Sequence, residues 1–148
     1  MPDSRGYCGI GVLNLKTKTN YGTLFRSAYA FNTDFLFLIG RRFKKQSSDT
    51  TRSERHLPLY EYSTFDGFYK NIPYGCRLIS VEMCGKAKPI REFSHPERAV
   101  YLLGPEDGSL SEKVIEKSFE VIEIPTKYCL NVAVAGSIVL FDRTNKIG

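Results

Sequence analysis

Three glycine-containing segments hold the residues whose types and spacing could do chemistry. The first reads NYGTLFR, in which Asn20 can cap a helix and Gly22 keeps the first helical turn open. Arg26 would lie on the side of this helix away from Leu24 and would point toward solvent or a cleft. Taken alone, the segment favours a capped helix with an ordinary surface arginine.

The second segment reads LGPEDGSL and follows an apolar run. Gly104 would allow a ligand to lie against the main chain, and Glu106 and Asp107 place two carboxylates in the same tight loop. A plain turn between a strand and a helix fits equally well, because acidic residues also favour the amino terminus of the helix that follows.

The third segment covers residues 124–131, between an apolar run and a stretch of small side chains. Its apolar flanks and free backbone amides would suit an adenine-like ring. Asn131 is placed to cap a helix over the following residues, VAVAGS. Such a helix is intrinsically weak, so its small residues indicate the close approach of another backbone or a ligand. A buried strand is the alternative, and periodicity does not separate the two.

A further segment is strongly basic. The chain has 21 Lys and Arg against 16 Asp and Glu, a net charge of +5 that permits a polyanionic partner without requiring one. Six of the basic residues fall close together: Arg41, Arg42, Lys44, Lys45, Arg52 and Arg55. They form either a solvated loop or a surface that contacts phosphates.

Other classes of protein are disfavoured by composition and spacing. The four cysteines have no C-x-x-C spacing, so we expect free thiols in a reducing compartment. His56 and His95 have no partner at metal-ligand spacing, and the glycines at residues 6–11 precede a strand, whereas a dinucleotide-binding loop must follow one. With no signal peptide visible and no apolar run near the roughly 20 residues of a membrane span, we expect a soluble cytoplasmic protein.

Alternating strands and helices must position these segments. We predict strands over residues 10–15, 35–39, 77–83, 99–103 and 119–124, with a further segment at 57–62. Helices are expected to begin near residue 21, at residue 65, and after Ser109, which has capping-box spacing to Glu112. The alternation indicates an α/β fold with a parallel sheet covered by helices on both faces. No repeat or linker divides the chain, so we expect one domain over residues 1–148.

Together, the three segments resemble the signature motifs of the SpoU/TrmH family of RNA ribose 2′-O-methyltransferases. N-x-G-x-x-x-R at residues 20–26 is similar to the first motif, and L-G-x-E-x-G at residues 103–108 is similar to the second. I-P at residues 124–125, followed by L-N-V at 130–132 and the small residues, is similar to the third. The motifs occur in the family's order and their resemblance covers nearly the whole chain.

The resemblance implies a five- or six-stranded parallel α/β fold whose carboxyl-terminal segment threads a loop to form a trefoil knot. It also implies a homodimer with S-adenosylmethionine as cofactor, RNA as substrate, and an active site completed across the interface. By motif position, Arg26 would be catalytic, Asn20 would shape its loop, and Glu106 would help build the ribose site. Cofactor contacts, largely through backbone atoms, would come from Val81, Leu103, Gly104, Ile124, Cys129 and Leu130. RNA contacts would come from the dimer surface, Arg26 and the six basic residues of the 41–55 stretch.

Two residues depart from the family pattern: Cys129 stands where many members have serine, and Pro105 replaces an amide side chain. Neither change removes the residues expected to carry the chemistry, so we expect an active RNA ribose 2′-O-methyltransferase without a metal. The short chain favours tRNA over rRNA as substrate. A non-catalytic RNA-binding or partner-binding protein with the knotted fold is the first alternative, and an unrelated nucleotide-binding module is the second.

Overall fold

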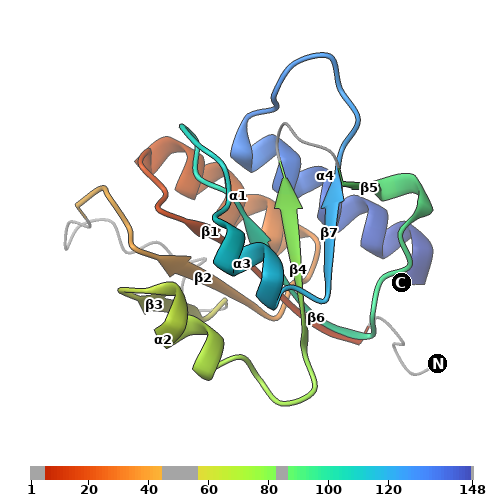
Figure 1. Ribbon diagram of the computed structural model, residues 1–148, viewed down its shortest axis with the longest axis horizontal. Helices are drawn as coiled ribbons and strands as arrows, with labels where there is room; N and C mark the ends of the chain where they lie inside the picture. The colour runs from red at the N-terminus through yellow and green to blue at the C-terminus, as the bar shows by residue number, and fades with distance from the viewer. Residues whose placement is uncertain (1–5, 45–56, 83–86, 148) are drawn as a thin grey trace.

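A seven-stranded, entirely parallel sheet forms the centre of the protein (Figure 1). The computed structural model describes residues 6–44, 57–82 and 87–147. The strand order is β3-β2-β1-β6-β4-β7-β5. The strands are β1 (Tyr7–Leu13), β2 (Phe35–Ile39), β3 (Leu59–Tyr62), β4 (Arg77–Glu82), β5 (Lys88–Pro89), β6 (Arg98–Leu103) and β7 (Glu120–Glu123). The sheet has more strands than the five or six expected, because short strands β3 and β5 extend its two edges.

Helices cover both faces of the sheet, as the alternating pattern predicts (Figure 1). The longer helices α1 (Lys18–Ala30) and α4 (Val132–Ile147) pack on one face, where they share a core with Ile10 and Val12 of β1. The short helices α2 (Phe65–Lys70) and α3 (Glu112–Lys117) pack on the other face, where they share a core with Phe35 and Phe37 of β2. A 3₁₀ turn (Ile90–Glu92) follows β5.

Two helices begin at different residues from those predicted. Helix α1 starts at Lys18 with Thr17 in the capping position, so Asn20 lies inside the helix and the prediction that it caps is wrong. Helix α3 starts at Glu112, and the hydroxyl of Ser111 rather than that of Ser109 accepts the capping bond, from the N–H of Val114. The capping motif placed helix α3 correctly along the chain but two residues too early.

Helix α4 settles the strand-or-helix alternative for the terminal segment. Asn131 caps it, because its Oδ1 accepts hydrogen bonds from the N–H groups of Ala133 at 2.8 Å and Val134 at 3.2 Å. At Gly136, a β-carbon would come within 2.6 Å of Leu24 in α1 and 3.1 Å of Leu103 in β6. The small residue therefore allows α4 to approach α1 and the sheet closely, as its composition indicates.

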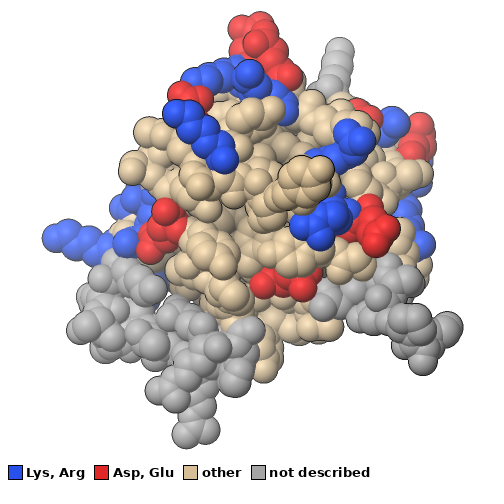
Figure 2. Space-filling view, turned by 90° about the horizontal axis from the view of Figure 1, so that it is seen from below, with Lys and Arg blue, Asp and Glu red and all other residues tan. Residues whose placement is uncertain are grey.

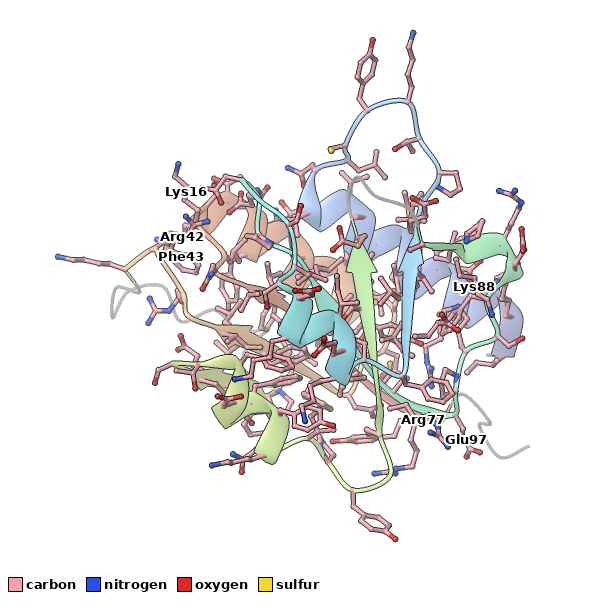
Figure 3. All side chains as sticks on the ribbon, viewed as in Figure 1. Lys16, Arg42, Phe43, Arg77, Lys88 and Glu97 are labelled. Atoms are coloured by element: carbon pink, nitrogen blue, oxygen red, sulfur yellow. The ribbon has the colours of Figure 1, made fainter. Side chains whose placement is uncertain are left out.

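The direction of the strands gathers three loops at one end of the molecule. The order runs outward from β1 to β2 and β3 on one side and to β6, β4 and β7 on the other, so β1 and β6 flank a switch point. The loops that follow β1, β6 and β7 all leave the carboxyl ends of their strands. Lys16 and Arg42 mark this end in Figure 3, whereas Arg77 and Glu97 lie at the opposite end.

Seen from the end where the strands begin, the surface has basic and acidic side chains interspersed with uncharged ones (Figure 2). The excess of basic residues therefore does not gather into a single patch on this face. No helix in the described part of the chain combines the length and apolar character needed to cross a bilayer.

Candidate active site

The carboxylate of Glu106 connects the loop after β6 to the loop after β1. Its Oε1 accepts hydrogen bonds from the backbone N–H of Lys16 at 2.6 Å and of Thr17 at 2.9 Å. Its Oε2 accepts a bond from Nδ2 of Asn20, in the first turn of α1. Glu106 thereby fixes both the start of α1 and the side chain of Asn20.

Asn20 extends this connection to the third loop. Because its Nδ2 donates to Glu106, its Oδ1 is free to accept, and it receives a bond from Nδ2 of Asn131 at 2.9 Å. Asn131 in turn caps α4. The three motif segments, which are separated by up to 111 residues in the chain, are thus joined by consecutive hydrogen bonds from Asn131 through Asn20 to Glu106.

Electrostatics keep Glu106 ionised. Desolvation raises the pKa of its carboxyl, but the hydrogen bonds from Thr17, Lys16 and Asn20 outweigh desolvation, and the pKa lies below its ordinary value of 4.5. A carboxylate with a lowered pKa and three donors is a poor general base near neutral pH. Its geometry suits it to hold the loops in place.

A cavity of about 520 Å³ lies beside these three residues. Besides Asn20, Glu106 and Asn131, it is lined by Glu82, Val132, residues 105 and 107–109 of the second segment, and Cys129 and Leu130 of the third. The volume falls within the range of small-molecule and cofactor sites. Among the described residues, no group of three or more His, Cys, Asp or Glu is placed to hold a metal.

Arg42 belongs to the rim of this site. Its guanidinium forms a bidentate pair with the carboxylate of Asp107, at 3.0 and 2.7 Å, and its Nε donates to the carbonyl of Asn14. The same ion pair lowers the pKa of Asp107. The neighbouring Arg41 pairs with Glu61 at 2.6 Å.

These ion pairs qualify the prediction that the basic stretch contacts phosphates. Arg41 and Arg42 are engaged with carboxylates of this chain, while Lys44 is exposed. Lys45, Arg52 and Arg55 lie outside the described residues. The sequence could not show the pairing, because Glu61 and Asp107 are far from the arginines along the chain.

The predicted site residues fall into three groups. Asn20, Glu106, Cys129 and Leu130 line the cavity. Val81 and Leu103 are fully buried at strand ends, so only their backbone atoms are suited to reach a ligand; Gly104 is also buried, and Ile124 packs partly buried against the core. Arg26 is exposed on α1, as expected from its place on the helix, and does not line the cavity.

One cysteine differs from the prediction that all cysteines are free thiols. Cys8 and Cys76 are not part of a disulfide, but Cys129 is disulfide-bonded, so the prediction of free thiols is wrong at this position. Cys84 lies outside the described residues.

The cavity also contains Glu82, which the sequence analysis missed. The sequence feature that could have indicated it is an acidic residue at the carboxyl end of an apolar strand.

Comparison with known proteins places the chain among RNA-modifying enzymes. Residues 9–141 match the SpoU rRNA Methylase family. No curated protein matches the chain significantly.

Three solved structures have a similar fold. One, from work on 2′-OH methylation of C/U34 on tRNA, has a TM-score of 0.82 and 24% identity, with 96% of this chain and 97% of that chain covered. The SpoU methyltransferase AviRb from Streptomyces viridochromogenes, in complex with AdoMet, has a TM-score of 0.80 and 19% identity over 98% of this chain and 61% of that one. The A. aeolicus TrmH/SpoU tRNA modifying enzyme has a TM-score of 0.78 and 18% identity, with coverages of 98% and 76%.

Proposed function

The chain belongs to the SpoU rRNA methylase family, and from this membership we propose that it transfers a methyl group from S-adenosylmethionine to a ribose 2′-hydroxyl of RNA. The observation that carries the proposal is the hydrogen-bonded connection from Asn131 through Asn20 to Glu106 beside a cavity of about 520 Å³. The similar structure from work on 2′-OH methylation of tRNA supports the position of the methyl group. We also propose that the carboxyl-terminal segment forms the trefoil knot that the family resemblance implies.

The residues around the cavity fit the proposed cofactor. S-adenosylmethionine, when bound, supplies a methyl group on a positively charged sulfur. The loop over residues 124–131 brings Cys129 and Leu130 to the cavity, where an apolar side chain suits the adenine ring. The carboxylates of Glu82, Glu106 and Asp107 also line the cavity, and their charge complements a cationic ligand.

The chain's own residues act in this proposal mainly by positioning. Glu106 and Asn20 hold the start of α1 against the loop after β6, and Asn131 holds the start of α4. Fixing three loops around one cavity orients two reactants, and orientation contributes a large part of the barrier lowering in transfer reactions. Glu106 does not serve as the general base, because its pKa is lowered.

Arg26 is assigned to the phosphate next to the reacting ribose. It is exposed and outside the cavity of its own chain, and a guanidinium keeps its proton while pairing with two phosphate oxygens. The proton of the hydroxyl would then pass to solvent or to that phosphate. Arg26→Lys should lower kcat/KM for RNA by about tenfold or more, with unchanged cofactor affinity and an unchanged shape of the pH–rate profile. Near-complete activity in Arg26→Lys would contradict the bidentate role.

A homodimer would bring Arg26 of one copy toward the cavity of another. The outer faces of α1 and α4 expose large apolar side chains: Tyr29 at 48%, Val134 at 45% and Phe141 at 59% of their surface. Phe31, which follows α1 directly, contacts Phe141 of α4, with their ring centroids 6.5 Å apart. Large apolar side chains exposed on two packed helices are typical of an interface between copies.

The proposed substrate is tRNA. The test is transfer of tritium from labelled S-adenosylmethionine to tRNA and, separately, to rRNA, both isolated from cells that lack the protein. Labelled RNA should then show a linkage resistant to alkaline hydrolysis, since methylation of the 2′-hydroxyl blocks the intramolecular attack. Arg26→Ala serves as the inactive control. Cofactor binding without labelling of either RNA would favour the non-catalytic binding protein, and labelling of rRNA alone would overturn the choice of substrate.

A further inference from the structure

Glu82 is the last residue of β4, and it places a carboxylate in the wall of the cavity. Its Oε1 atom is buried and has no hydrogen-bond partner among the described residues. The other two carboxylates of the cavity are both engaged, Glu106 with the loop after β1 and Asp107 with Arg42. A buried carboxylate oxygen without a donor is costly, so this atom is suited to a ligand that brings one.

The strand order places Glu82 in the middle of the cavity. Strand β4 lies between β6 and β7. The loop after β6 carries Glu106, which accepts from Asn20 and which the family resemblance assigns to the site of the RNA ribose. The loop after β7 covers residues 124–131, which the proposed function assigns to the adenine ring. A residue at the end of β4 therefore faces the part of the cofactor between its adenine and its sulfur.

We propose that Glu82 binds the ribose hydroxyls of S-adenosylmethionine. In that molecule the ribose joins adenine to the sulfur-bearing carbon, and its 2′- and 3′-hydroxyls are hydrogen-bond donors. An ionised carboxylate accepts only, with two oxygens that suit a pair of neighbouring hydroxyls. Acidic residues at strand ends bind a cofactor ribose in the same way in dinucleotide-binding sheets. The inference rests on the proposed function, since it concerns the cofactor of that reaction.

The test compares S-adenosylhomocysteine with its 2′-deoxy and 3′-deoxy analogues by calorimetry. The unaltered protein should bind the parent compound about ten- to a hundredfold more tightly than the analogues, as expected for charge-assisted hydrogen bonds. Glu82→Ala should weaken the parent by a similar factor and abolish most of the preference over the analogues. Glu82→Gln, which keeps the shape of the side chain, should give a smaller loss and covers the case in which the alanine variant is unstable.

Glu123→Gln is the matched control, because Glu123 is the register partner of Glu82 on β7 and does not line the cavity. It should leave all affinities unchanged. Equal losses for the parent and the deoxy analogues in the Glu82 variants would overturn the assignment to ribose, as would a loss confined to S-adenosylmethionine, which would place Glu82 at the sulfur. If the unaltered protein binds S-adenosylhomocysteine and the Glu82 variants bind it equally well, this inference alone fails. If the unaltered protein binds neither S-adenosylhomocysteine nor S-adenosylmethionine, the proposed function fails as well.

Discussion

Asn20 and Asn131 are the residues through which the three loops of the site depend on one another. Each amide uses both of its ends: Asn20 donates to Glu106 and accepts from Asn131, while Asn131 donates to Asn20 and accepts from the start of α4. A side chain that only accepts or only donates would not fill either place. The requirement for asparagine thus follows from hydrogen-bond direction, which is visible only once the three segments meet.

Asn20→Asp is expected to lower the free energy of unfolding by about 1–3 kcal/mol at pH 7, because it sets an acceptor-only carboxylate against Glu106. In the unaltered protein, Glu106 has a lowered pKa, so its contribution is complete above 4.5 and is lost as the pH falls through and below that value. In the variant, protonation relieves the repulsion between the two carboxylates over the same pH range. Urea unfolding should therefore show a difference between the two proteins that narrows on acidification.

Asn145→Asp, an exposed change on α4 away from the cavity, is the control for the effect of one added charge. It should cost little at either pH. A difference for Asn20→Asp that does not depend on pH would contradict the proposed contact between two carboxylates.

Helices α1 and α4 pack closely on one face of the sheet, and each has a glycine as its fifth residue. Their surroundings differ. A β-carbon at Gly136 would come within 2.6 Å of Leu24, whereas a β-carbon at Gly22 would meet no atom within 4 Å. The small residues around Gly136 indicated close packing of α4, whereas the open space beside Gly22 is visible only in the structure.

Gly136→Ala should therefore destabilise the protein by about 1–3 kcal/mol through overpacking, in spite of the higher helix propensity of alanine. Gly22→Ala should instead stabilise it by up to about 1 kcal/mol, since only the propensity changes. Urea unfolding of the two variants measures both effects. Equal and small effects would mean that α4 has room to move away from α1.

The second half of α4 is attached to the segment before β6 by a buried polar cluster. Arg143 donates to the hydroxyl of Tyr101 at 2.9 Å, and that hydroxyl is hydrogen-bonded to Nδ1 of His95 at 2.7 Å. Nε2 of His95 donates to the carboxylate of Asp142, also at 2.7 Å, because an ionised carboxylate only accepts. In the neutral ring the proton therefore lies on Nε2, and Nδ1 accepts from Tyr101.

Desolvation lowers the pKa of His95, and the hydrogen bond to Asp142 offsets this effect only in part. Because the folded protein then takes up a proton less readily than the unfolded chain, stability should fall as the pH drops below 6.5 toward the lowered pKa. His95→Gln should reduce stability at pH 7 and remove this part of the slope. Parallel curves for the two proteins between pH 7 and 5 would contradict the assignment.

At the scale of the whole molecule, the site and the apolar surface are parts of one proposed assembly. Arg26 lies outside the cavity, on the same helix that exposes Tyr29. A second copy packed against α1 and α4 would cover the apolar side chains and supply the arginine that the cavity of a single chain lacks.

Phe141→Glu should convert the proposed dimer to monomers, because a charge would be buried in the interface. Sedimentation should show the change in mass, and RNA methylation should fall while affinity for S-adenosylhomocysteine is retained. Ile115→Glu is the control, because Ile115 is an exposed apolar residue on α3, at the opposite face of the sheet from α1 and α4. A monomeric unaltered protein that methylates RNA would contradict a site shared between two chains.

The sequence by itself determined the α/β class, the extent of β2, the start of α2 and the order of the three motif segments, because apolar periodicity, capping residues and glycine spacing are local properties. It also indicated close packing of α4 from its small side chains. Only the tertiary structure decided that Asn20 joins two loops instead of capping a helix, that Arg42 pairs with Asp107, and that Glu82 lines the cavity. These features join residues distant along the chain, and their partners are set by strand order and the parallel direction of the sheet.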